Sequence, residues 1–227
     1  MGTTPHYRAS SKRGLPMLGD RFRGGEMRNW CIAIILAATS ATAAAQSAPL
    51  RPPSDFASIA DERARSQALF KEAGRVIQSP RCLNCHPVTR RPTQGDDVHA
   101  HVPPMYGGPA GSGVASLPCF SCHGRSNMQT FSKAIPSIPG NERWQLAPAS
   151  MAWQGKSLPQ ICDQLKDRAR NGDHSLAEIH EHAAKDALVG WAWHPGDGRV
   201  PAPGTQKQFG ELIGAWISTG AHCPAEN

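Results

Sequence analysis

Long apolar runs and nucleotide-binding loops are absent from this sequence. No stretch reaches the 18 or more apolar residues of a membrane-spanning helix, which excludes a multi-span membrane protein. No Walker-type or G-x-G-x-x-G loop is present, so nothing indicates nucleotide binding by either type of glycine-rich loop. Charged residues are only 19% of the 227, whereas glycines number 22 and prolines 20. This composition favours short helices within much irregular chain over a large regular sheet.

Residues 1–45 have the features of a leader that contains a secretory signal peptide. A positive charge precedes a short apolar core at residues 31–38, and the alanines at 43–45 form an A-x-A cleavage pattern. Met27 stands where such a signal begins, so residues 1–26 are either an over-extended start or part of a basic n-region. A buried core helix is the alternative for the apolar run. The signal predicts export to the periplasm.

Removing the leader also removes most of the positive charge. The whole chain carries +6, but the first 45 residues hold six basic and two acidic residues, so the mature chain carries +2. Its remaining basic residues are scattered along the sequence. The mature chain therefore lacks the basic footprint of a nucleic-acid-binding protein, and we expect no membrane span in it.

Four of the seven cysteines form two copies of one motif. Both copies read C-x-x-C-H, the attachment motif of c-type haem: Cys82, Cys85 and His86 in the first, and Cys119, Cys122 and His123 in the second. In that chemistry two thiols one short turn apart bind the two vinyl groups of a haem. The histidine that follows binds the iron on its proximal side. The two motifs predict two covalent haem c groups.

Zinc, a redox dithiol and structural disulfides are the alternative uses of these cysteines. The 33 residues between Cys85 and Cys119 exceed the spacing of roughly 15–20 that is typical of paired C-x-x-C zinc sites. A histidine after each of two pairs is unusual for a redox dithiol. Haem attachment takes place outside the cytoplasm, so the predicted signal and the motifs support each other.

Cys162 and Cys223 remain in the C-terminal half of the chain. In an oxidising compartment a disulfide between them is the simplest account, and two free thiols are the alternative. A disulfide closing a loop of this length contributes about 3–4 kcal/mol to stability.

Apolar residues at helical spacing predict four helices, at residues 55–78, 158–170, 176–189 and 206–219. Each begins near a pair of residues typical of a capping box: Ser58 with Asp61, Ser157 with Gln160, Ser175 with Glu178, and Thr205 with Gln208. Residues 46–54 are a Pro-rich linker, so we expect the dihaem domain to span residues 55–227.

Two irregular segments surround the second motif. Residues 87–118 are rich in Gly, Pro and His, and we interpret them as an ordered loop that wraps haem. Residues 124–155 are rich in turns and contain Trp144 and Trp153. These two rings would pack either on porphyrin or in an ordinary core.

The distal side of each iron is bound by a second residue or is open for catalysis. Methionine raises the potential of the iron and histidine lowers it. His101 lies in the wrapping loop, and Met151 lies in a Pro-flanked loop downstream of the second motif. We predict these two as distal ligands, with His182 as the next candidate. The remaining candidates are His99, His174, His180, His194, His222, Met105 and Met128.

The paired motifs resemble those of dihaem c-type cytochromes. The helix before the first motif and the C-terminal helix are similar to the terminal helix pair of the cytochrome c fold. The resemblance implies a mainly α protein with extensive irregular loops around two covalently attached haems, in a cytochrome c-like or a small multihaem arrangement. Both arrangements stay open, because the second motif has no clear flanking helices of its own.

Four stretches extend the resemblance over most of the mature chain. They are similar to a bacterial group named isoquinoline 1-oxidoreductase subunit, and they cover residues 146–153, 162–167, 188–193 and 220–224. The resemblance implies a cytochrome that receives electrons from a periplasmic molybdenum hydroxylase as its redox partner protein. No molybdopterin or iron–sulfur signature is visible, so this chain would be the acceptor.

The sequence therefore predicts an electron carrier between a partner oxidoreductase and the respiratory chain, with no catalytic residue of its own. The alternative is a haem enzyme, a peroxidase or a small-molecule oxidoreductase, with one open iron. No constellation of acid and base residues stands out in support of that alternative.

Overall fold

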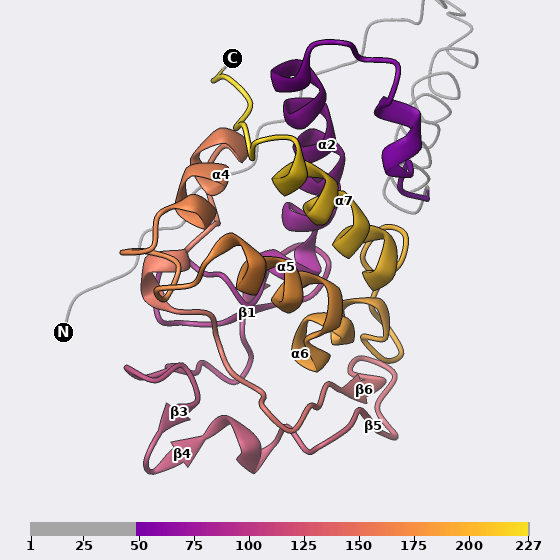
Figure 1. The fold of residues 1–227 in the computed structure, drawn as a ribbon. Helices are drawn as coiled ribbons and strands as arrows, with labels where there is room; N and C mark the ends of the chain where they lie inside the picture. The colour runs from indigo at the N-terminus through magenta and orange to yellow at the C-terminus, as the bar shows by residue number, and fades with distance from the viewer. Residues whose placement is uncertain (1–48, 227) are drawn as a thin grey trace, which may run out of the picture. The chain divides into compact units, whose positions relative to one another are not determined.

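The structure is a computed structural model that describes residues 49–226, and the predicted signal and Met27 lie outside these residues. The described chain is mainly helical with long irregular stretches, as the composition predicts (Figure 1). Its helices are α2 (Glu62–Ile77), α3 (Pro80–Leu83), α4 (Leu158–Lys166), α5 (Leu176–Lys185), α6 (Ala187–Gly190) and α7 (Gln206–Ser218). Short 3₁₀ turns are η1 (Pro53–Phe56), η2 (Cys119–Ser121), η3 (Ala149–Met151) and η4 (Trp191–Trp193). No helix in this part of the chain is long and apolar enough to cross a bilayer.

Three short antiparallel hairpins interrupt the irregular segments. They pair β1 (Thr93–Gln94) with β2 (His99–Ala100), β3 (Gly113–Val114) with β4 (Leu117–Pro118), and β5 (Met128–Gln129) with β6 (Ser137–Ile138). The segment predicted as a wrapping loop thus contains two hairpins. In Figure 1, β3 to β6 lie beyond α5 and α6, away from α2.

The predicted first helix is wrong at its start. Residues 53–56 form η1, and α2 begins only after Asp61, whose side chain accepts a hydrogen bond from the Ala64 N–H at 2.6 Å. Asp61 is therefore the N-cap itself and not the third residue of a box begun by Ser58. Leu50, within the predicted linker, is already buried in the core.

The capping boxes predicted for α4 and α5 are confirmed. Ser157 caps α4 with Gln160, and Ser175 caps α5 with Glu178. The predicted helix 176–189 is wrong at one point, because Asp186 adopts extended backbone angles between α5 and α6. Its carboxylate accepts from the first N–H groups of α6, so the chain starts a new helix there.

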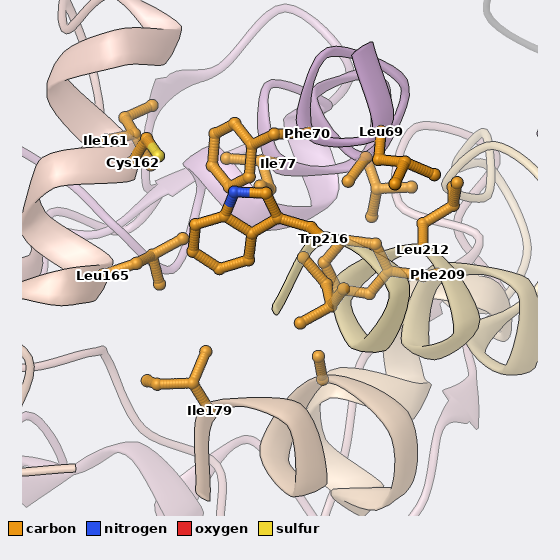
Figure 2. Packing of buried hydrophobic residues seen from close by; sticks show 14 of the residues in the cluster. Leu69, Phe70, Ile77, Ile161, Cys162, Leu165, Ile179, Phe209, Leu212 and Trp216 are labelled. Carbon is orange, nitrogen blue, oxygen red and sulfur yellow. The ribbon is translucent and has the colours of Figure 1, made fainter. Parts of the chain in front are cut away.

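α7 is the central helix of the core, and its predicted cap at Thr205 is confirmed. It packs against both α2 and α5 (Figure 1). Trp216 is fully buried, and its ring lies 4.8 Å from that of Phe70 on α2 (Figure 2). Leu165 of α4 and Ile179 of α5 enclose the same region (Figure 2). One apolar cluster therefore joins all four longer helices.

The predicted disulfide is present, between Cys162 of α4 and Cys223 beyond α7. The bond spans 61 residues of sequence, and Cys162 is fully buried in the core cluster. It ties α4 to the segment that follows the central helix.

Two glycines of α7 face α5, and only one of them is in tight backbone contact. A Cβ atom on Gly210 would lie 2.5 Å from the Cβ and 2.8 Å from the Cα of Ala184. A Cβ atom on Gly214 would meet only the imidazole of His180, at 3.1 Å. The close approach of α5 and α7 therefore depends on Gly210.

Gly210→Ala is expected to lower the free energy of unfolding by up to about 2 kcal/mol. Overpacking against the α5 backbone costs about 1–3 kcal/mol, which outweighs the gain of about 1 kcal/mol in helix propensity. The matched change Gly214→Ala keeps the propensity gain, because a side chain can move away. Denaturant unfolding of both variants measures the difference, and equal stabilities would contradict a backbone contact at Gly210.

Candidate haem sites

The two C-x-x-C-H motifs form the same local turn. In the first, the carbonyl oxygen of Cys82 accepts hydrogen bonds from the N–H groups of Cys85 and His86, both at 3.1 Å. The carbonyl oxygen of Cys119 repeats this pattern, accepting at 3.2 and 3.0 Å from the cysteine and histidine that follow it. None of the four motif cysteines is in a disulfide. Each turn holds two free thiols next to one imidazole, the set that haem attachment uses.

A cavity of about 430 Å³ lies beside the first motif. Such a volume falls within the roughly 300–1,000 Å³ of small-molecule and cofactor sites. Both motif cysteines and His86 line it, opposed by residues of α5 and α7. Much of its wall is apolar and continuous with the core: Ile77, Leu165, Ile179, Phe209 and Ile213. The helical core thus contains a hollow at the first motif.

His86 is held with one ring nitrogen available. Its Nδ1 lies 2.7 Å from the carbonyl oxygen of Met151, which can only accept, so Nδ1 carries the proton. Trp153 stacks on the ring at 3.5 Å, with the planes 6° apart. The pKa of His86 is lowered to about 4, mainly by burial and to a smaller extent by nearby His182, while the hydrogen bond to the Met151 carbonyl opposes the shift. The imidazole is neutral at pH 7, with a lone pair on Nε2 for a metal.

Arg81, immediately before the first motif, was not among the predicted site residues. It lines the cavity and is only 3% exposed. One terminal nitrogen donates to the carbonyl of Gly95 (2.8 Å) and pairs with Asp96 (2.6 Å). Its Nε has no hydrogen-bond partner among the described residues. A buried guanidinium with an unused donor fits an anionic group within the cavity.

Burial disfavours the ionised form of the first pair of thiols. It raises the pKa of Cys82 to about 12 and that of Cys85 to about 11. Both thiols are therefore protonated at neutral pH in the chain without a bound group. No group of three or more metal-ligating side chains occurs within residues 49–226. Haem needs only one or two side chains on each iron.

The second motif repeats the arrangement at the surface. The Nδ1 of His123 lies 2.7 Å from the carbonyl oxygen of Pro139, which leaves Nε2 available. Trp144 stacks on this imidazole at 4.7 Å, with the planes 19° apart. The two tryptophans singled out in the sequence therefore each lie against a motif histidine, one at each site.

His101 lies beside the second motif. Its ring centroid is 6.0 Å from that of His123, with the planes 64° apart. Its Nδ1 lies 2.8 Å from the carbonyl oxygen of Pro103, so this histidine also has Nε2 available. Its place in the loop between the motifs brings it to the second site.

Exposed apolar side chains concentrate around the second motif. Eight of the ten large hydrophobic residues that are exposed lie between 102 and 135: Val102, Tyr106, Val114, Leu117, Phe120, Met128, Phe131 and Ile135. Single exposed apolar side chains are ordinary, but eight in one segment of 34 residues would form a binding surface if they adjoin one another. This segment has apolar side chains but lacks a core of its own to bury them.

Met151 and His182 both line the first cavity, at different places. The backbone oxygen of Met151 contacts His86 at Nδ1, away from Nε2. His182 enters from α5 with its Nδ1 3.6 Å from Asp186, and its side chain is 57% exposed. The backbone of Met151 thus contacts the Nδ1 edge of His86, whereas His182 reaches the cavity from α5.

Among the other candidate ligands, His174 also lines the first cavity. His99 has both ring nitrogens engaged, by Asp97 and Gln94. His180 lies against Gly214 on α7.

The chain matches no protein-family model, no curated protein and no solved structure.

Proposed function

We propose that this protein is a periplasmic dihaem c-type cytochrome that carries electrons between a partner oxidoreductase and the respiratory chain. The observation that carries the proposal is the shared design of the two motifs. Each presents two free thiols and a histidine whose Nδ1 is bound to a carbonyl oxygen and whose ring is stacked on tryptophan. Such outer partners fix the tautomer and orientation of metal-binding histidines.

The residues present fit a haem at each motif. Cys82 and Cys85 would hold the first by thioethers, with His86 as its proximal ligand. Cys119 and Cys122 would hold the second, with His123 as its proximal ligand. Each haem supplies an iron that alternates between the ferrous and ferric states.

Other features of the two sites suit the bound group. The first cavity provides an apolar enclosure, and the unused Nε of the buried Arg81 fits a propionate carboxylate. At the second site, the exposed apolar side chains would be covered by the porphyrin, which supplies the missing core. We infer that the two sites belong to one compact unit, as in the small multihaem arrangement.

The placement of three candidates supports an assignment of the distal ligands. The rings of His101 and His123 have centroids 6.0 Å apart, and each has its Nε2 available, so both would be within reach of one iron. We assign His101 to the second iron and His182 to the first, and we give Met151 the role of orienting His86.

The partner is proposed from the resemblance alone. Four stretches of the chain are similar to the isoquinoline 1-oxidoreductase subunit group, which implies a periplasmic molybdenum hydroxylase as electron donor. The carrier role places substrate chemistry in that partner.

Electronic spectra and electron paramagnetic resonance of the purified, haem-loaded protein test the proposal. We expect two six-coordinate, low-spin haems with histidine on both sides. His182→Ala is expected to convert one haem to the high-spin form, and His101→Ala the other, because each loses its distal nitrogen. His99→Ala is the matched control and is expected to change neither.

Two outcomes would contradict parts of this account. A resting high-spin haem in the unaltered protein would favour the alternative, an enzyme with one open iron. A signature of methionine ligation that Met151→Leu removes would reassign the distal ligand to Met151. Absence of haem would remove the proposal as a whole.

A further inference from the structure

Two tryptophans connect the two candidate sites. Trp144, which stacks on His123 at the second site, also meets Trp191 edge-to-face, with ring centroids 4.9 Å apart and planes at 83°. Trp191 belongs to η4 and lines the cavity of the first site. Its ring also lies under the guanidinium of the buried Arg81, 6.0 Å from the centroid. One end of this ring pair therefore contacts each site.

A hydrogen-bonded side chain holds the pair in place. The Trp191 Nε1 donates to Oδ1 of Asn127 at 2.9 Å, and the Gly140 N–H donates to the same oxygen at 3.0 Å. The Asn127 Nδ2 donates to the carbonyl of His194 at 2.7 Å. Asn127 thereby fastens η4 to the segment that contains Pro139, the residue whose carbonyl orients His123.

Stability alone is a weak reason for this arrangement. An edge-to-face aromatic pair contributes about 0.5–1.5 kcal/mol beyond its burial. Both rings are only partly buried, and both lie outside the core cluster that contains the fully buried Trp216. Their position between the two sites is the feature that a packing role does not explain.

We propose that Trp144 and Trp191 form the contact through which an electron passes between the two haem sites. This inference rests on the proposed function, because it requires a haem at each motif. The step moves one electron: the donor haem is oxidised from ferrous to ferric, the acceptor haem is reduced from ferric to ferrous, and no bond forms or breaks. Trp144 contacts His123, the two rings contact each other, and Trp191 lines the first cavity, so an electron would pass through packed side chains between the sites.

The test measures the rate of electron transfer between the haems in the fully loaded protein, after rapid photochemical reduction of one of them. Trp191→Leu removes the ring and is expected to give a several-fold loss of rate. Trp191→Phe keeps a ring but loses the bond to Asn127, and it is expected to retain most of the rate. Trp193→Leu is the matched control, because Trp193 lies in the same turn but packs against Phe209 instead.

Haem content and both reduction potentials are measured first on every variant. A protein without two haems refutes the proposed function. Two haems with unchanged potentials and an unchanged rate in Trp191→Leu overturn only the role of the ring pair. Trp144→Leu, in a half-exposed irregular segment, provides the same test if Trp191→Leu does not fold. An equal loss of rate in Trp193→Leu would also overturn the inference.

Discussion

Replacing both cysteines of the first motif (Cys82→Ala with Cys85→Ala) is expected to leave one haem and an unfolded helical core. The same replacement at the second motif (Cys119→Ala with Cys122→Ala) is expected to leave one haem and a folded core. The first site is a hollow of about 430 Å³ between the main helices, whereas the second lies among hairpins at the surface.

The size of the cavity sets the expected difference. Without a bound group, the apolar side chains that line this volume would lose their burial on one side, and each such loss is a sizeable part of the roughly 5–15 kcal/mol that stabilises a typical domain. Water that enters the open side reduces the cost without removing it, because apolar core residues line the wall. The second site lies nearer the surface, where Cys119 is half-buried and Cys122 is exposed, so less of the core is expected to depend on it.

Far-ultraviolet circular dichroism and haem content of the two exported variants provide the comparison. Native helix content is expected only when the second motif, and not the first, is removed. Equal folding of both variants, or a greater loss from the second motif, would contradict the placement of the first haem in the core.

Removing the disulfide (Cys162→Ala with Cys223→Ala) is expected to lower the free energy of unfolding by about 4 kcal/mol. The bond closes a loop of 61 residues of sequence separation, and the entropy of that loop in the unfolded chain gives an estimate of this size. Loss of the buried sulfur of Cys162 adds to the effect. The first helix to separate would be α4, which the bond ties to the chain end.

Guanidinium unfolding of the haem-loaded protein and the double variant measures this difference. Cys162→Ala alone also lacks the cross-link. The difference in stability between this single variant and the double variant therefore measures the change at Cys223 by itself. A difference below about 1 kcal/mol would show that the packing of α4, and not the cross-link, holds that end of the fold.

Local signals in the sequence predicted the parts of the fold that local chemistry decides. The side chains of Ser157, Ser175 and Thr205 each accept a hydrogen bond from a backbone N–H in the first turn of their own helix. A few neighbouring residues of sequence are therefore enough to predict each cap. The disulfide was predictable because, outside the predicted leader with Cys31, only Cys162 and Cys223 remained after the motifs. The break at Asp186 was missed because apolar spacing continues across it, while its carboxylate caps the next helix.

The candidate site was predictable only as far as the motifs extend. Arg81 adjoins the first motif, but its burial depends on Gly95 and Asp96, which a later hairpin brings to it. The contact between Trp144 and Trp191 joins segments 47 residues apart in the sequence. His101 was a candidate for either iron, and only the folded loop places it beside His123.

Peptide mapping of the exported protein by mass spectrometry tests the central claim most directly. We expect the peptide containing Cys82 and Cys85 and the peptide containing Cys119 and Cys122 each to carry the mass of one covalently bound haem. The peptide pair containing Cys162 and Cys223 would be joined by a disulfide and carry none. Unmodified motif cysteines, or a disulfide within each motif, in protein matured by a host that attaches haem c, would contradict the account.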